Sequence, residues 1–543
     1  MTADTETKND TASSNSTLAW FCLGTLLLIA VPQFLCSPLT NDASYYDIQA
    51  RTALRGGVLY RDMVEPNLPG VVWIHMAVRS VAGWSSEILR TFDLVLFLTT
   101  ASLFGVWNAR ASHRRTTGLW TVITLTLIYL SVSEWCQVQR DIWVLLPVVI
   151  ALHLRSRQVG RLQNDATTHR TIIGWSFVEG CCLGAGVWIK PHILIPAACV
   201  WGIGAGKGIG RKVALDFAGV LCGGLFAGGL GISWMVSTGA WSPFLDMMLN
   251  WNPEYLSSGS KMWGQFAIAA PLRRLLPFSL VHLVAIPAAV TSLLKRSRID
   301  SRCALEMRLT AALYLGWCVQ VAMLQNPFDY IHIVPVLIGV AFAGLWVSIK
   351  WTSHSSRRAL VYAYLTAAIV FSPVKELDRI RLWPRCFREG SSAEMRNALA
   401  QIPYPDWEDL ERVGEYLKAQ KIQEGQLTCW SSDLIQLHLD LNIHPPTRNA
   451  YVGALLMFFP SRRQDIQDEV IAGAERFVLT NFMAGGLLIH EAEEAGPDGY
   501  LGLPPQFPQH LRKEFPWNLP IVFRSGSLAV HEMPEGNVAG GQQ

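Results

Sequence analysis

Long apolar blocks alternate with short polar segments over the first two thirds of the chain. The clearest blocks are Leu18–Cys36, Thr91–Trp107, Lys212–Val236, Leu275–Leu294 and Phe328–Ile349. Each is close to the roughly 20 residues that a helix needs to cross a bilayer core of about 30 Å. Backbone groups find no partners in lipid, and the blocks lack the alternation of barrel strands. The pattern therefore predicts a polytopic α-helical membrane protein.

Shorter or more polar blocks bring the number of candidate membrane helices to twelve. The predicted helices cover residues 18–36, 71–84, 91–107, 118–135, 142–154, 172–189, 191–206, 212–236, 275–294, 305–324, 328–349 and 358–374.

The distribution of lysine and arginine orients these helices, because cytoplasmic loops carry an excess of both. Residues 140–141, Lys190, 237–272, 325–329 and the chain after Pro373 are poor in cations or alternate with cation-rich loops, so we predict them outside. The five loops predicted inside contain Arg110, Arg114 and Arg115; Arg155, Arg157, Arg161 and Arg170; Lys207, Arg211 and Lys212; Lys295, Arg296, Arg298 and Arg302; and Lys350, Arg357 and Arg358.

An inside N-terminus and an outside C-terminus require an odd number of spans, so twelve is inconsistent. The weakest candidate is 71–84, which is short and contains His75 and Arg79. We expect this segment to lie partly in the membrane interface, which leaves eleven spans. A thirteenth span is the alternative, so the expected number of transmembrane helices is about 11 to 13.

Composition supports a membrane protein. Hydrophobic residues make up 50% of the 543 residues and charged residues only 16%, whereas soluble domains average roughly 25% charged residues. The net charge of +3 identifies no partner, because the cations collect in loops, and nothing indicates nucleic acid. Residues 1–17 are polar with a single lysine, unlike the basic start of a cleaved signal, so 18–36 is predicted to be a retained helix.

The eleven cysteines lie mostly inside apolar blocks and have no CxxC spacing. We interpret them as small core residues, and they imply neither a disulfide framework nor a metal site. Cys386 and Cys429 lie outside the membrane blocks, so a bridge between them is an option that no pattern supports.

The composition changes at Lys375, where charged residues, prolines and turn signals replace long apolar runs. Helical spacing and an acidic first turn predict a helix over Asp406–Lys421. Gln426–Trp430, Arg476–Thr480 and Ile521–Phe523 are predicted to be short strands. The expected organisation is a polar tail at 1–17, a transmembrane domain at 18–374 whose first outside loop is about 37–70, and an extracytoplasmic α/β domain at 375–543.

The most informative segment is the outside loop after the first helix. Its ordered features are Asp42, Tyr46, Ala50, Gly57, Tyr60, Asp62 and Pro69-Gly70. This order resembles the first extracytoplasmic loop of the GT-C membrane glycosyltransferases, in particular the protein mannosyltransferase and aminoarabinose transferase branch, similar to glycosyltransferase family 39. Many relatives carry two adjacent acids at the first position or a double proline at the last. Asn41-Asp42 and Leu68-Pro69-Gly70 depart from both, which leaves the number of catalytic carboxylates and any metal requirement open.

The resemblance implies transfer of a sugar from a polyprenyl-phosphate donor. Such a reaction needs a base that takes the proton of the acceptor hydroxyl, and a carboxylate suits this role. The leaving group is a phosphate, so cations that stabilise its growing charge are needed and a general acid is not. Asp42 is the predicted base, against the alternative of a solvated aspartate that caps a helix. Asp47 is expected to be structural. Asp62, Tyr46 and Tyr60 are candidate contacts to the lipid phosphate or the acceptor, although a structural role for Asp62 is favoured.

Two further segments match the resemblance. Gln139-Arg140-Asp141 is similar to the Arg/Asp pair that brings a second acid to the site, or it is an interfacial pair that caps a helix. Lys190-Pro191 resembles the Lys-Pro between two helices in many relatives, although a lysine between apolar blocks can simply extend to the interface. The resemblance thus implies donor-phosphate binding by Lys190 and Arg140, and Asp141 as a possible second acid.

Several other polar residues fall in or beside apolar blocks. Tyr330 and His332 resemble the entrance to a late helix, where they would contact the lipid phosphate or satisfy the interface. Intramembrane acids usually face protein or water. Asp93 belongs to a segment, 87–93, that we interpret as an intrahelical charge cluster that holds helix packing, whereas Glu179 has no partner that the sequence identifies. The aromatic residues of the loop 237–272 are interpreted as an interfacial belt, with stacking on sugar as the alternative.

The predicted function is that of an inverting glycosyltransferase, integral to the cytoplasmic or an ER-equivalent membrane. A sugar would pass from a polyprenyl-phosphate donor to a hydroxyl of a protein, lipid or polysaccharide on the extracytoplasmic side. No cofactor is assigned with certainty, a divalent metal is open without support, and no metal ligands are predicted. The alternative is a transporter or flippase of polyprenyl-linked glycans, which would favour broken helices and internal pseudo-symmetry; no repeat of the first half is visible.

Overall fold

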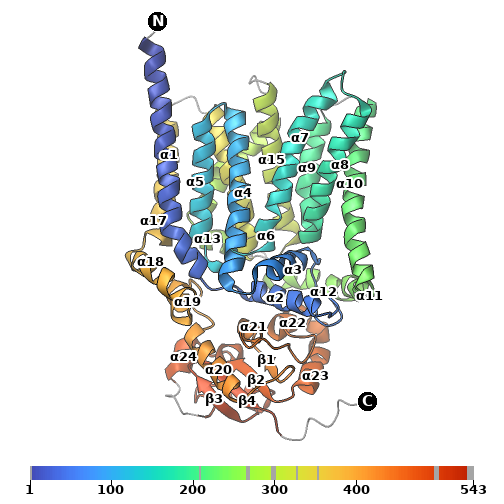
Figure 1. Cartoon of the computed structure of the whole chain (residues 1–543), viewed down its shortest axis with the longest axis vertical. Helices are drawn as coiled ribbons and strands as arrows, with labels where there is room; N and C mark the ends of the chain where they lie inside the picture. The colour runs from blue at the N-terminus through green and yellow to red at the C-terminus, as the bar shows by residue number, and fades with distance from the viewer. Residues whose placement is uncertain are drawn as a thin grey trace.

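The computed structural model describes residues 3–206, 210–263, 269–294, 301–325, 328–350, 354–494 and 501–534. Figure 1 shows long helices side by side in a bundle, with a smaller domain that contains a β-sheet at one end. Two short helices, α2 (Asn41–Leu54) and α3 (Gly70–Ala82), lie between the bundle and this domain.

The bundle corresponds closely to the predicted membrane helices. Its helices are α1 (Ala3–Cys36), α4 (Ser86–Ser112), α5 (Arg115–Ser131), α6 (Arg140–Trp143), α7 (Leu145–Gln163), α8 (His169–Ile189), α9 (Leu194–Ala205), α10 (Gly210–Ser237), α14 (Val281–Leu294), α15 (Ser301–Leu324), α16 (Asp329–Lys350) and α17 (His354–Val370). Three shorter helices, α11 (Trp241–Asp246), α12 (Asn252–Trp263) and α13 (Ala269–Arg274), fall in the predicted outside loop and at its end. The polar residues from Ala3 onward continue α1 as helix.

Seven helices in the described part of the chain are long and apolar enough to cross a membrane, as judged by length and composition. They cover residues 16–36, 86–112, 140–163, 169–189, 210–237, 302–324 and 329–350. The helices α5, α9, α14 and α17 have 17 residues or fewer and occupy the four remaining ranges of the eleven expected spans.

The segment predicted to lie partly in the interface forms α3. Its 13 residues extend about 20 Å, which is shorter than the roughly 30 Å of a bilayer core. His75 and Arg79 are fully or almost fully buried, and both contact Asp47 of α2, at 2.8 Å for His75 and 2.5 Å for Arg79. The charges of α3 therefore face a neighbouring helix, and Asp47 has the structural role expected for it.

The smaller domain contains a four-stranded sheet in the order β1-β2-β4-β3. β1 (Leu427–Cys429) and β2 (Phe477–Asn481) are parallel, whereas β4 (Leu528–Glu532) is antiparallel to both β2 and β3 (Ile521–Ser525). The strands β1, β2 and β3 confirm the three predicted ones. The helices of this part of the chain are α18 (Leu377–Glu389), which packs against the end of α1, and α19 (Ala393–Leu399), α20 (Trp407–Ala419), α21 (Gln436–Asp440), α22 (Val452–Phe458), α23 (Arg463–Gly473) and α24 (Ile489–Glu494).

The predicted helix over Asp406–Lys421 is α20. Asp406 caps it, because its carboxylate accepts hydrogen bonds from the backbone N–H groups of Glu408 and Asp409, both at 3.0 Å. Leu410 and Val413, one turn apart, are buried against the sheet in one core cluster.

Cys386 does not meet Cys429. Cys386 lies on α18 against Cys36 at the end of α1, where the Cys36 thiol contacts the Cys386 carbonyl oxygen at 3.6 Å. Cys429 lies in β1, with its Sγ 3.5 Å from the carbonyl oxygen of Leu434. The two cysteines that the sequence left as an option therefore belong to different cores.

The cation-rich segments lie at the end of the bundle away from the sheet domain (Figure 1). Arg110 at the end of α4 and Arg302 at the start of α15 both contact Glu306, at 3.5 and 3.7 Å. Lys212 contacts Asp165 between α7 and α8 at 3.4 Å. The predicted loop residues Lys207, Lys295, Arg296 and Arg298 lie outside the described residues.

Arg155 was expected in an inside loop, but it is buried inside α7. Its guanidinium contacts Glu179 of α8 at 2.8 Å and Asp216 of α10 at 2.7 Å. Glu179 therefore has a partner, and the three side chains tie three helices together. Counting charges along the chain misplaced Arg155 because an arginine that pairs with acids on other helices has the same sequence signal as a solvated one.

The segment 87–93 is likewise held by contacts with other elements. Arg90 donates to the carbonyl oxygen of Ser37 at 2.7 Å and to Gln137 at 2.8 Å. Asp93 accepts hydrogen bonds from the hydroxyl of Tyr129 and the indole of Trp143, at 2.5 and 2.7 Å. These charges hold helix packing, as interpreted: Arg90 and Asp93 interact within α4, and their hydrogen bonds join α4 to its neighbours and to the start of the first loop.

Candidate functional site

Asp42 lies in the first turn of α2, at the bundle end that carries the sheet domain. The Thr40 side chain begins the helix by accepting a hydrogen bond from the Ala43 N–H at 3.3 Å. Asp42 is partly exposed, and its carboxylate accepts hydrogen bonds from the Tyr451 hydroxyl at 3.0 Å and from Gln139 Nε2 at 3.5 Å. Three segments that are distant in sequence therefore meet at this carboxylate.

The surroundings of Asp42 favour its protonated form relative to an ordinary aspartate. Burial raises the pKa of Asp42, and the hydrogen bond from Tyr451, the charge of Arg140 and the hydrogen bond from Gln139 offset this only in part. A carboxylate with a raised pKa holds a proton more strongly, so it is a better general base than a solvated aspartate.

Arg140 is the first residue of α6 and is partly exposed. Its guanidinium makes no hydrogen bond or ion pair with another described residue. Three tyrosines, Tyr46, Tyr255 and Tyr330, lie within its electrostatic range. An arginine with five N–H donors and no competing partner is well suited to hold a phosphate group.

Lys190 and Asp141 form an ion pair, and both are buried, with 2% and 1% of their surfaces exposed. The sequence assigned Lys190 to the donor phosphate and Asp141 to the role of a second acid. In the structure each neutralises the other, while one Asp141 oxygen has no hydrogen-bond partner among the described residues. Of the predicted cations at this site, Arg140 is thus the one that makes no ion pair with a described residue, and the carboxyl groups of Asp42, Glu65 and Asp141 lie within its electrostatic range.

The first-loop pattern and the Lys-Pro segment are in direct contact. Gly70 begins α3 against the backbone of Trp188 and Ile189, and a Cβ at Gly70 would lie 2.5 Å from the Trp188 carbonyl oxygen. Only a glycine fits this approach. Two of the segments that carried the resemblance are therefore neighbours in space.

The remaining residues of the first-loop pattern shape the loop. The Tyr60 hydroxyl donates to the Asn67 carbonyl oxygen at 2.8 Å. Asp62 accepts from the Val58 N–H at 2.7 Å and pairs with Arg61 at 2.6 Å. Both residues brace the turn that leads into α3, as expected for Asp62.

Three further predicted contacts, Tyr46, Tyr330 and His332, have different surroundings. Tyr46 is buried on α2 and faces the His75 ring, with ring centroids 5.7 Å apart. Tyr330 begins α16 within electrostatic range of both Asp42 and Arg140. His332, two residues further on, is buried within α16. Tyr330 therefore lies near both Asp42 and Arg140, and His332 lies within electrostatic range of Lys190.

Sequence reasoning missed Glu65. This carboxylate is 2% exposed and accepts hydrogen bonds from Gln49 at 2.7 Å and from the Asn67 side chain at 2.5 Å. Burial raises the pKa of Glu65, partly offset by Gln49, Arg140 and Asn67. The sequence feature that could have identified Glu65 is its position in the first loop, between Asp62 and Pro69.

The aromatic residues of 237–272 do not all form an interfacial belt. Trp251 is buried, with Phe459 and Arg462 of the C-terminal domain against its ring at 5.2 and 4.3 Å. Tyr255 packs on Phe458 at 5.0 Å. These residues join the outside loop to the domain; the side chains of Lys261 and Trp263 lie outside those described.

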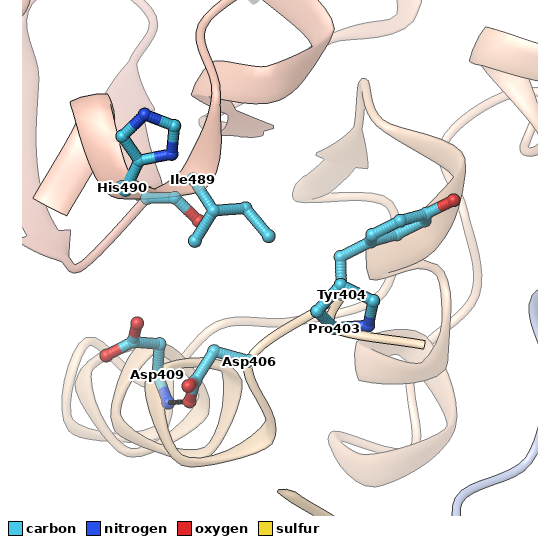
Figure 2. A pocket seen from close by; sticks show the side chains of 7 residues that line it. Pro403, Tyr404, Asp406, Asp409, Ile489 and His490 are labelled. Carbon is cyan, nitrogen blue, oxygen red and sulfur yellow. Dashed lines mark hydrogen bonds between the residues drawn. The ribbon is translucent and has the colours of Figure 1, made fainter. Parts of the chain in front are cut away.

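The described residues offer a cavity elsewhere in the molecule but no metal-binding cluster. In the described ranges, no group of three or more His, Cys, Asp or Glu side chains is placed to hold a metal ion. A cavity of about 390 Å³ lies in the C-terminal domain, with Asp406 and Asp409 of α20 on one side and Ile489 and His490 of α24 on the other (Figure 2). None of the predicted site residues lines it.

Comparison with known proteins finds solved structures of similar architecture. No protein-family model and no curated protein matches the chain. Among solved structures, ArnT from Cupriavidus metallidurans bound to undecaprenyl phosphate matches 97% of this chain and 100% of its own, with 13% identity and a TM-score of 0.55. The Archaeoglobus fulgidus oligosaccharyltransferase AglB, in complex with an inhibitory peptide and a dolichol-phosphate, matches 85% of this chain and 69% of its own, with 12% identity and a TM-score of 0.43.

The similarity to ArnT extends over the bundle and the C-terminal domain, since it covers nearly the whole of both chains. The sequence identity is too low to carry more than architecture. The chain therefore shares the fold of ArnT: a polytopic helical domain followed by a C-terminal domain.

Proposed function

We propose that the protein is an inverting glycosyltransferase that moves a sugar from a polyprenyl-phosphate donor to an acceptor hydroxyl. The observation that carries this proposal is the placement of Asp42 within electrostatic range of Arg140 on a GT-C fold. A partly exposed carboxylate with a raised pKa and a guanidinium without an ion pair are the base and the phosphate ligand that this reaction needs.

The reaction follows from these two groups. Asp42 takes the proton of the acceptor hydroxyl, and the hydroxyl oxygen attacks the anomeric carbon of the donor from the face opposite the phosphate. The bond from that carbon to the phosphate oxygen breaks, and the polyprenyl phosphate leaves with one further negative charge. Attack opposite the leaving phosphate inverts the configuration at the anomeric carbon. Arg140 stabilises the charge on the phosphate, so no general acid is required.

Further side chains support the two principal groups. Lys190 lies within electrostatic range of Arg140 and contributes to donor-phosphate binding as part of its ion pair with Asp141; Asp141 then holds Lys190 and does not act as a second base. In this proposal Tyr330 and Tyr46 contact the lipid phosphate or the acceptor, while Tyr60, Asp62 and His332 act through the shape of the site.

The donor class and the sidedness have separate support. ArnT was solved with undecaprenyl phosphate, which favours a polyprenyl-phosphate sugar, either a hexose or a pentose, as donor. The cation-rich loops lie at the opposite end of the bundle, which favours an extracytoplasmic site. In this proposal residues 18–374 form the transmembrane domain and 375–543 the extracytoplasmic domain, and the acceptor is a protein, a lipid or a polysaccharide.

The test is an incubation of the purified protein in lipid with radiolabelled polyprenyl-phosphate sugars and a panel of acceptors. Asp42→Ala and Asp42→Asn remove the base. Asp246→Asn is a matched control, because Asp246 is an exposed aspartate of α11 that contacts Asn250 at 2.7 Å. We expect label to leave the lipid with wild type and Asp246→Asn, and not with either Asp42 variant.

Two outcomes would contradict the proposal. Equal release by the Asp42→Ala protein would remove Asp42 as the base. No release from any donor by folded protein would reject the transferase, and an assay of lipid-linked sugar translocation would then test the transporter alternative.

A further inference from the structure

The C-terminal domain reaches directly into the candidate site. Tyr451 precedes α22, and its hydroxyl donates to Asp42 Oδ1 at 3.0 Å. Its ring stacks on Tyr45 of α2, with centroids 4.8 Å apart and planes 17° from parallel. The predicted base therefore shares a hydrogen bond with a residue 409 positions later in the chain.

A second set of contacts fixes Tyr451 relative to the first loop. The Tyr45 hydroxyl donates to the Val64 carbonyl oxygen, and the Val64 N–H donates to the Arg448 carbonyl oxygen at 3.0 Å. Tyr451 thus contacts Tyr45, and Arg448 contacts Val64, the two residues that one hydrogen bond joins in the first loop. Because these four residues form a closed ring of contacts, a movement of the Tyr451 ring would disturb the hydrogen bond between Tyr45 and Val64.

The remainder of α2 is also anchored to this domain. Arg51 donates to the carbonyl oxygens of His438 and Ile443 at 2.8 and 2.6 Å. Ser44 donates to Gln436 at 2.6 Å. The helix that carries Asp42 is therefore fixed on one face by α3 and on another by the C-terminal domain.

The two oxygens of Asp42 are not equivalent. Oδ1 accepts the hydrogen bond from Tyr451, whereas Oδ2 has only the 3.5 Å contact with Gln139, which is at the limit of a hydrogen bond. The charged groups that face this carboxylate are Arg140 and Asp141. Oδ2 is thus the oxygen that is available to an acceptor hydroxyl.

We propose that the C-terminal domain is part of the catalytic unit and that Tyr451 is a positioning residue, which holds Oδ1 so that Oδ2 of Asp42 takes the acceptor proton. The catalytic role of Tyr451 in this inference rests on the proposed function. The contact between the two side chains can be tested without any activity.

The variant Tyr451→Phe removes the hydroxyl and keeps the ring that stacks on Tyr45. Tyr416→Phe is the matched control, because Tyr416 is a half-buried tyrosine of the same domain that stacks on Phe523 at 4.5 Å. Its hydroxyl makes no hydrogen bond with another described residue. Thermal unfolding of both variants confirms that each is folded.

The first measurement is an infrared titration of the Asp42 carboxyl band, obtained by subtracting the spectrum of the Asp42→Asn protein at each pH. The hydrogen bond from Tyr451 stabilises the ionised carboxylate, so its loss should move the titration midpoint up by roughly one pH unit. Tyr416→Phe should leave the midpoint where it is in wild type. An unchanged midpoint in Tyr451→Phe overturns the proposal.

The second measurement is the pH dependence of sugar transfer by the same proteins. In Tyr451→Phe the acid limb of kcat/KM should move upward by the same amount, while Tyr416→Phe follows wild type. A shifted infrared midpoint with an unshifted activity profile overturns the positioning role. If wild type transfers no sugar, the proposed function fails, and the infrared titration still decides whether Tyr451 controls Asp42.

Discussion

Lys190 and Asp141 form an ion pair in which neither side chain has more than a few per cent of its surface exposed. Removing one partner would leave the other as an isolated buried charge. We therefore expect Lys190→Met to lower the free energy of unfolding by about 3–5 kcal/mol. The double variant Lys190→Met/Asp141→Leu should be clearly more stable than Lys190→Met. Thermal unfolding in detergent measures both, and equal stability of the single and double variants would contradict a buried pair.

Arg140 should behave in the opposite way. Because its guanidinium makes no ion pair or hydrogen bond with the described residues, Arg140→Gln should leave the melting temperature close to that of wild type. Loss of a donor to the departing phosphate should lower kcat about 100-fold. Transfer assays with saturating donor measure this, and a variant that loses stability while its remaining folded fraction turns over normally would assign Arg140 to structure instead.

The pH dependence of transfer follows from the raised pKa of Asp42. The base must be ionised, so kcat/KM should fall as the pH drops through that pKa, at a higher pH than the roughly 3.9 of an ordinary aspartate. A profile that is flat down to the pKa of an ordinary aspartate would contradict the role of Asp42.

The same pKa has a consequence for stability. A folded-state pKa above the unfolded value means that the folded protein binds the proton more tightly, so the contribution of Asp42 to stability is lost as the pH rises through its folded pKa. At neutral pH the ionised carboxylate is therefore unfavourable for folding. We expect Asp42→Asn to melt at the same temperature as wild type or higher, and a large loss of stability would indicate a structural aspartate.

The features that could be predicted from the sequence are each encoded in a short segment of the chain. A membrane helix is encoded by about 20 consecutive apolar residues, and the cap of α20 by Asp406 directly before a helical pattern. Asp42 and Arg140 could be selected because each stands at a helix start within a recognisable segment. Their proximity then follows from the fold.

The parts that the sequence did not predict depend on partners far away in the chain. Tyr451 has no local feature that separates it from other tyrosines of the domain. Arg155 has the local signal of a loop cation, and only the neighbouring helices α8 and α10 supply the acids that bury it. Trp251 has the signal of an interfacial tryptophan, and the C-terminal domain covers it. In each case the deciding contact joins elements whose relative placement is not encoded in a short segment.

Gly70 offers a test of the contact between the first loop and the Lys-Pro segment. A methyl group at Gly70 would lie 2.5 Å from the backbone of Trp188, which cannot move aside like a side chain. We expect Gly70→Ala to lower the free energy of unfolding by about 1–3 kcal/mol and to reduce transfer. Gly24→Ala in α1 is the matched control, because nothing lies within 4 Å of its Cβ position. Similar melting temperatures for the two variants would argue against this packing.

Cys36 and Cys386 test the docking of α18 against the end of α1. Both are buried in one small core, and Cys36 Sγ lies 3.6 Å from the Cys386 carbonyl oxygen. We expect diamide, which accepts two electrons and two protons, to join them in a disulfide. Mass spectrometry of proteolysed protein should then recover the two peptides linked, in wild type and in Cys429→Ser but not in Cys386→Ser. Recovery of both cysteines only as separately alkylated peptides would mean that α18 does not lie where the structure places it.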